Sequence, residues 1–68
     1  MKSYDVQFVE DYKALKSQYT RLKNTLEFWD KLLEKPNCPK DLLEEQLDIL
    51  YNLIKIVETR ADTEGISL

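Results

Sequence analysis

The feature that most constrains this chain is the regular spacing of apolar residues through its first half. These residues recur at alternating intervals of four and three, which keeps one stripe of an α-helix facing a partner. The stripe consists of Phe8, Tyr12, Leu15, Tyr19, Leu22, Leu26, Trp29 and Leu33. Mostly charged and polar residues fill the positions between them. The pattern predicts a long helix over residues 5–34.

The pattern breaks at residues 35–40, where Pro36 and Pro39 stand close together. Proline lacks a backbone N–H and disfavours helix in the residue before it. We therefore expect a loop over 35–40, a second helix over 41–61 and a tail over 62–68. The tail is expected to fray or to dock weakly through Ile66 and Leu68. A loop this short folds the helices back on each other, which predicts an antiparallel hairpin.

The start of the second helix has two interpretations. Asp41 caps the helix with Glu44 three residues later, as in a capping box. Alternatively, Pro39 takes the first helical position and Asp41 lies within the first turn. In both cases the acidic residues lie near the positive end of the helix dipole, where they are stabilising.

The second helix carries apolar residues on two neighbouring stripes. The first stripe is Leu43, Leu47, Leu50, Ile54, Val57 and Ala61. The second, one residue earlier at each position, is Leu42, Gln46, Ile49, Leu53, Ile56 and Arg60. The stripes are about 100° apart around the helix axis, so one antiparallel neighbour cannot cover both.

The uncovered stripe predicts assembly with other subunits, because exposed apolar patches of this kind are interaction sites. The simplest solution is a homodimer in which two hairpins form a four-helix bundle. We expect an oligomer interface at Leu42, Ile49, Leu53, Ile56 and Phe28. Basic residues gather in the middle and open end of the hairpin and acidic ones near the loop, which favours packing with the loops at opposite ends.

Length and composition agree with a single all-α domain that resembles a short coiled coil. With 68 residues the chain needs regular packing or association to be stable, because its one cysteine, Cys38, cannot form an internal disulfide. We expect no membrane segment, since no stretch approaches the roughly 20 apolar residues that a span requires. With no export signal and a single thiol, a cytoplasmic location is expected.

The residues needed for catalysis are missing from the sequence. It has no histidine and one glycine, so neither a nucleophile–base pair nor a phosphate-cradling loop can be built. We therefore expect no enzyme, no metal site and no cofactor. The net charge of −3 also argues against duplex nucleic acid as a partner.

Tyrosines and basic residues at helical spacings have two interpretations. In the first, the tyrosines belong to the packed seam and the basic residues to a solvated surface. In the second, the tyrosines offer flat surfaces for a base and the basic residues contact phosphates at subunit interfaces. The candidate ligand-binding residues are Lys13, Lys16, Arg21, Lys23, Arg60, Tyr12, Tyr19 and Tyr51.

The order of these motifs over residues 8–60 resembles small phage-encoded helical-hairpin proteins. The resemblance rests on the tyrosine-rich first helix, the short polar loop and the segment Leu42-Leu43-Glu44-Glu45-Gln46-Leu47. Proteins of that group include host-takeover and anti-defence factors, among them oligomeric sponges for cyclic nucleotides. The resemblance implies non-catalytic binding of a host protein or a nucleotide in the host cytoplasm, and it identifies no binding residue.

Three functional hypotheses follow. The first is an oligomeric interaction module, such as a phage-encoded inhibitor that binds a host protein. The second is an oligomeric sponge that sequesters a cyclic or other nucleotide at subunit interfaces. The third is a small structural or assembly protein.

Overall fold

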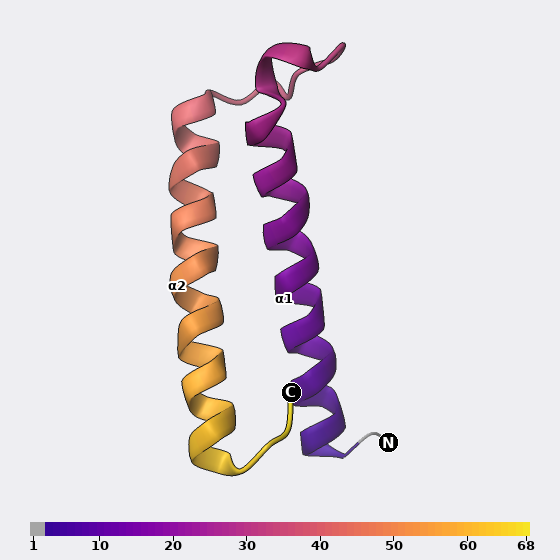
Figure 1. The fold of residues 1–68 in the computed structure, drawn as a ribbon, viewed down its shortest axis with the longest axis vertical. Helices are drawn as coiled ribbons and strands as arrows, with labels where there is room; N and C mark the ends of the chain where they lie inside the picture. The colour runs from indigo at the N-terminus through magenta and orange to yellow at the C-terminus, as the bar shows by residue number, and fades with distance from the viewer. Residues whose placement is uncertain (1–2) are drawn as a thin grey trace.

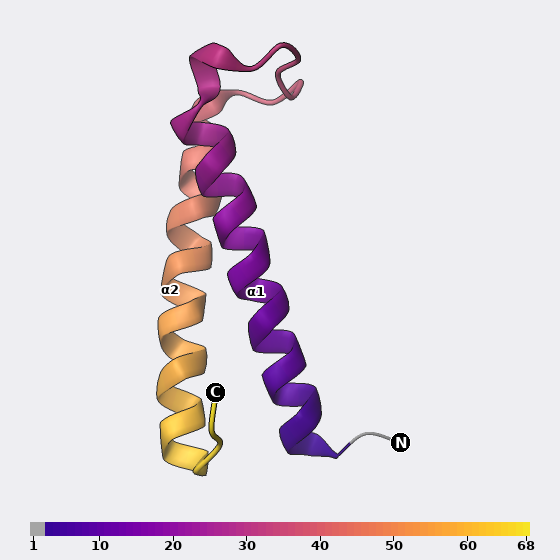
Figure 2. The same cartoon turned by 45° about the vertical axis from the view of Figure 1, so that its right-hand side comes forward.

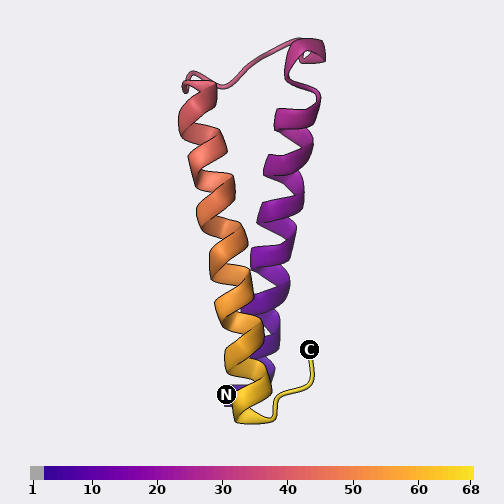
Figure 3. The same ribbon diagram turned by 60° about the vertical axis from the view of Figure 1, so that its left-hand side comes forward.

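The computed structural model describes residues 3–68 as two antiparallel helices joined into a hairpin (Figure 1). Helix α1 spans Tyr4–Glu27, a single 3-10 turn η1 spans Trp29–Lys31, and helix α2 spans Lys40–Glu64. The helices cross at a shallow angle, so they overlap near the connection in Figure 2 and near the chain ends in Figure 3. The Cα trace extends 42 × 23 × 15 Å. The prediction of an all-α antiparallel hairpin is confirmed.

Helix α1 begins where its sequence supplies a cap. The Ser3 hydroxyl accepts a hydrogen bond from the backbone N–H of Val6 at 3.3 Å, which satisfies one of the free donors of the first turn. Asp5 lies in that turn, near the positive end of the helix dipole. These two side chains explain why helix begins at Tyr4.

The first helix ends at Glu27 and does not run to Glu34 as expected. Tyr4 pairs with Glu64 and Tyr12 with Glu58. In this register, helical residues 31–34 would extend past the start of α2 and have no helix to pack against. The chain instead makes the turn η1 and becomes extended at Leu32.

Because α1 ends at Glu27, the last two residues of the predicted stripe lie outside the helix. Leu33 is fully exposed and outside any helix. Trp29 is half-buried in η1, with the Lys35 ammonium 5.7 Å from its ring centre. The connection therefore covers residues 28–39, rather than 35–40.

Helix α2 begins at Lys40, directly after Pro39, whose carbonyl accepts hydrogen bonds from the N–H groups of Leu42 and Leu43. Asp41 lies within the first turn and is not the capping residue, so the capping box with Glu44 does not form. The structure agrees with the second interpretation in placing Asp41, although Pro39 takes the cap position and not the first helical one.

Helix α2 continues to Glu64, three residues beyond the predicted end at Ala61. Gly65 follows in the left-handed conformation at φ 70°, and the N–H of Ile66 donates to the Ala61 carbonyl at 2.8 Å. This bond and the one from Gly65 to Asp62 form a Schellman cap. Ile66 packs against the core, which agrees with the alternative in which the tail docks through this residue.

Leu50 and Ile54 are buried on the seam of α2, and the main buried cluster lies at the end of the hairpin where the helices begin and finish. Phe8, Val57 and Ala61 are buried there and pack together, with half-buried side chains around them. Those surrounding side chains are Tyr12, Leu15 and Ile66. We call this region, residues 4–15 and 54–66, the open end. Around the connection, in residues 22–27 and 40–47, the seam residues are only half-buried; we call this region the loop end.

Candidate functional site

The hairpin presents two broad faces, one on each side of the plane that contains both helices. Grooves between the helices show which residues share the first face: Arg60 lies beside Gln7, and Gln46 lies beside Arg21. Hydrogen bonds and ring contacts identify the second face through Tyr12 with Glu58 and Tyr19 with Tyr51. We call the first the apolar face and the second the tyrosine face.

The apolar face carries the second stripe of α2, which α1 leaves uncovered. Leu42, Ile49 and Ile56 expose 54%, 60% and 58% of their surface, and Leu53 exposes 40%. Phe28, at the end of α1, exposes 52%. Single exposed apolar side chains are ordinary on a protein surface, but four of them along one helix stand out from that background.

The tyrosine face combines aromatic rings with ammonium groups from both helices. The Lys16 ammonium lies 5.8 Å from the centre of the Tyr12 ring, and the Lys55 ammonium 5.4 Å from the Tyr51 ring. The rings of Tyr19 and Tyr51 meet across the helices with centres 6.2 Å apart and planes tilted by 43°. The register of these pairs places Lys16 of α1 level with Lys55 of α2.

Two tyrosine hydroxyls tie the helices together through acidic side chains. The Tyr12 hydroxyl donates to the Glu58 carboxylate at 2.7 Å, and Tyr4 donates to Glu64 at the same distance. Each bond favours the protonated phenol, so the hydrogen bond to Glu58 raises the pKa of Tyr12 and the one to Glu64 raises that of Tyr4. Both hydroxyls are donors at neutral pH.

Arg60 lies at the open end on the apolar face, where it and Tyr12 line the same groove. Its guanidinium is 5.1 Å from the centre of the Phe8 ring, donates to the Tyr4 hydroxyl at 3.2 Å and lies 3.6 Å from the Glu64 carboxylate. These residues border a groove of about 150 Å³. More than half of the Arg60 side chain remains exposed, so it can still reach a further anion.

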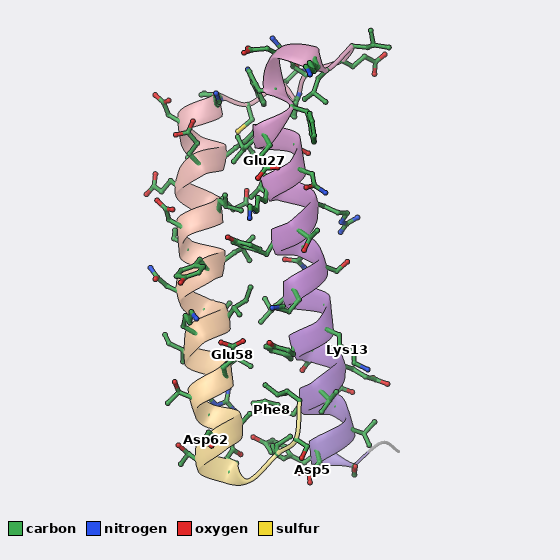
Figure 4. The ribbon with its side chains drawn as sticks, in the orientation of Figure 1. Asp5, Phe8, Lys13, Glu27, Glu58 and Asp62 are labelled. Atoms are coloured by element: carbon green, nitrogen blue, oxygen red, sulfur yellow. The ribbon has the colours of Figure 1, made fainter. Side chains whose placement is uncertain are left out.

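The structure brings together only part of the predicted ligand-binding set. The tyrosine face holds Lys16, Tyr12, Tyr19 and Tyr51. Helical spacing places Lys23 on the same side of α1, two turns beyond Lys16. Arg21 and Arg60 line grooves on the apolar face, and Lys13 projects from the outer side of α1 (Figure 4).

The predicted ligand-binding set leaves out Lys55, although antiparallel pairing places it beside the basic stretch of the first helix. The residue stands alone among the apolar positions of the second helix, so nothing nearby in the sequence marks it. The signal that identifies it is the pairing of the helices, since only the antiparallel register places Lys55 opposite Lys16. Sequence reasoning also missed Tyr4, whose partners Arg60 and Glu64 lie at the other end of the chain.

Two further properties hold for residues 3–68. No acidic and cysteine side chains gather in threes as a metal site requires. Neither helix is long and apolar enough to serve as a membrane span.

Comparison with known proteins identifies one family. A family model described as Sequestin matches residues 2–63 and so covers both helices and the connection. The description points to sequestration, which is a binding role and not a catalytic one. No curated protein and no solved structure matches the chain.

Proposed function

This chain belongs to the Sequestin family, and from that premise we propose that it sequesters a nucleotide by stoichiometric, non-catalytic binding. The protein holds the ligand and returns it unchanged, which lowers the free concentration available to other proteins. The resemblance to phage-encoded hairpins puts cyclic and other signalling nucleotides of a host cell first among the candidates.

The observation that carries this proposal is the combination of rings and ammonium groups on the tyrosine face. Tyr12, Tyr19 and Tyr51 offer aromatic surface to a base, for which stacking is worth about 1–3 kcal/mol. Lys16 lies beside the Tyr12 ring and Lys55 beside the Tyr51 ring, so each ring has an ammonium group next to it that can contact a phosphate. Lys23 extends the positive surface along α1.

The same surface explains why binding is not followed by a reaction. The ammonium groups are donors that neutralise charge, and the hydrogen bond to Glu58 raises the pKa of Tyr12, so its hydroxyl keeps its proton at neutral pH. The acidic side chain among them, Glu58, already accepts from Tyr12 and lies 4.0 Å from Lys55. These groups hold a phosphate without attacking it.

Isothermal titration calorimetry with a panel of mono-, di- and cyclic nucleotides tests the proposal. We expect saturable binding by at least one of them, weakened by salt because the contacts are between charges. Lys16→Ala and Lys55→Ala should each weaken binding about tenfold, since a hydrogen bond to a charged group contributes about 1.5–3 kcal/mol. Lys40→Ala, at the start of α2, is the matched control and should bind as the unaltered protein does.

A second measurement separates sequestration from turnover. The bound nucleotide is released by heat and analysed by chromatography, and we expect it to be recovered intact. Binding of none of the panel, or equal effects of Lys16→Ala and Lys40→Ala, would contradict the proposal. Conversion of the nucleotide would instead make the protein an enzyme.

The exposed stripe of the apolar face supports a second element of the function, which is assembly. We propose that the protein works as a homo-oligomer, in the simplest case a homodimeric four-helix bundle, through Leu42, Ile49, Leu53 and Ile56. Leu53→Asp should dissociate it, because burying an unpaired charge costs several kcal/mol. Light scattering at several protein concentrations measures this.

A protein partner is the alternative occupant of the apolar face. The observation in its favour is the extent of exposed apolar surface, which includes Phe28 at the end of α1. In that case the unaltered chain alone is monomeric at micromolar concentration and sequesters a protein instead of a nucleotide. Light scattering and the nucleotide titration therefore distinguish the two functions.

A further inference from the structure

The stripe on the apolar face is symmetric about its own centre. Its members lie at equal distances on either side of residue 51: Ile49 and Leu53 nearest, Gln46 and Ile56 next, Leu42 and Arg60 outermost. Its four apolar members, between Leu42 and Ile56, are all exposed. A stripe with this symmetry matches a reversed copy of itself, as an antiparallel helix pair requires.

We infer that a second copy of this chain docks on the stripe with α2 antiparallel to α2 and with Ile49 of each copy against Leu53 of the other. This inference rests on the assembly element of the proposed function and adds the orientation and register of the two copies. The interface is isologous: each contact occurs twice, related by a two-fold axis that passes between the helices at residue 51.

The charges beside the stripe decide the orientation. Glu45 borders the hollow beside Leu42 and Ile49, and Arg60 ends the stripe at the open end. In the antiparallel register, Arg60 of each copy lies across from Leu42 and within reach of Glu45 on the other copy. A parallel pair would instead bring Arg60 against Arg60 and Glu45 against Glu45, and like charges at an interface are repulsive.

The contacts inside one chain leave both groups available for this pairing. The Arg60 side chain is 53% exposed despite its contacts with Tyr4, Phe8 and Glu64. Glu45 is exposed, and within residues 3–68 its carboxylate takes part in no hydrogen bond or ion pair. Two reciprocal pairs therefore close the two ends of the apolar contact.

The only cysteine measures the orientation directly. Cys38 lies at the loop end, just before α2, so a nitroxide spin label on it reports the distance between loops in a dimer. At 1.5 Å per residue the inferred register places the two labels about 40 Å apart. A slip by one heptad changes that distance by about 10 Å, and a parallel pair brings the labels within roughly 20 Å.

Pulsed electron spin resonance on the labelled, unaltered sequence gives one of three results. A distance near 40 Å supports the inference. A short distance overturns it and leaves assembly and sequestration standing. A signal without dipolar coupling at a concentration of tens of micromolar means a monomer, which overturns both the inference and the assembly element, while nucleotide binding in the same sample tests sequestration separately.

Charge reversal tests the Glu45–Arg60 pairing independently. Glu45→Arg and Arg60→Glu should each weaken self-association about tenfold or more in sedimentation, and an equimolar mixture of the two variants should restore it, because each mixed pair regains opposite charges. Glu44→Arg, the same change one residue earlier and towards the tyrosine face, is the matched control and should associate normally. Equal effects of Glu44→Arg and Glu45→Arg, or no recovery in the mixture, would overturn the pairing.

Discussion

The two ends of the hairpin are built from similar apolar seams and yet differ in packing. At the open end Phe8, Val57 and Ala61 are buried and Ile66 folds back onto them. At the loop end Leu22, Leu26, Leu43 and Leu47 occupy equivalent seam positions and are only half-buried. The difference shows that a heptad seam specifies which side of a helix faces its partner, and does not specify how tightly the two helices close.

Polar contacts account for part of the difference. The hydrogen bonds from Tyr4 to Glu64 and from Tyr12 to Glu58 join α1 to α2 across the open end. An aromatic ring at the interface lets the seam residue pack with its body and bond with its tip. The leucines of the loop end have no such tip, so apolar contact alone holds the helices together there.

The largest expected effect is that of removing the buried ring at the open end. Phe8→Ala should lower the free energy of unfolding by about 3–5 kcal/mol, as for other buried phenylalanines. Leu26→Ala, its counterpart at the loop end, should cost about 1 kcal/mol because the leucine is only half-buried. Urea denaturation at one fixed protein concentration measures both, and equal losses would show that the two ends are packed alike.

Hydrogen exchange should sharpen the comparison without altering the chain. The amides of α1 residues 22–27 should exchange about tenfold faster than those of residues 8–15. Local opening costs less free energy where fewer apolar contacts are buried. Mass spectrometry of peptic fragments or NMR resolves the two segments. Uniform protection along α1 would mean that the assembled protein closes the loop end, and hence that the interface covers it.

Replacing the glycine that caps α2 should lower the free energy of unfolding by about 1 kcal/mol. Gly65 has φ 70°, a conformation that costs an L-residue about 1–2 kcal/mol, although an added Cβ would meet no atom within 4 Å. Gly65→Ala should therefore destabilise the protein, whereas Gly65→Asn should do so less because asparagine tolerates this conformation. Thermal unfolding measures both, and equal stability of all three forms would exclude strain at the cap.

The smallest expected effect concerns the pH dependence of the open end. The bond to Glu58 raises the pKa of Tyr12, so this bond stabilises the folded chain below about pH 10 and is lost as the pH rises through the raised pKa. Tyr12→Phe should be slightly less stable than the unaltered protein at about pH 8, and this difference in stability should shrink as the pH rises through the raised pKa of Tyr12. Tyr51→Phe serves as the control, since Tyr51 packs through its ring.

The sequence predicted the hairpin and the exposed stripe because both depend on residues at regular spacing within one helix. Leu42, Ile49, Leu53 and Ile56 were assigned from that spacing, and the structure leaves them exposed within one chain. The end of α1 was predicted wrongly because Trp29 and Leu33 continue the spacing. The first helix ends where the second helix is no longer beside it, and the spacing within the first helix carries no information about where the second begins.

The candidate site was predictable only in part for the same reason. Tyr12 and Lys16 lie one turn apart on one helix, so sequence spacing places them together. Arg21 and Lys13 belong to the same run of basic residues and yet lie on other sides of α1. Lys55 joins the site from the second helix, and only the register between helices brings it there.

Residues 28–39 act as a tether more than as a structural element. They join the helices at the end where packing is loosest, so their main contribution is entropic: they hold α2 near α1 at an effective concentration in the millimolar range. The tight contacts form at the far end and need no continuous backbone. Two separate peptides carrying α1 and α2 should therefore associate into the same helix pair. The hairpin could then be divided into a two-part reporter, in which the amount of paired helix depends on the peptide concentration.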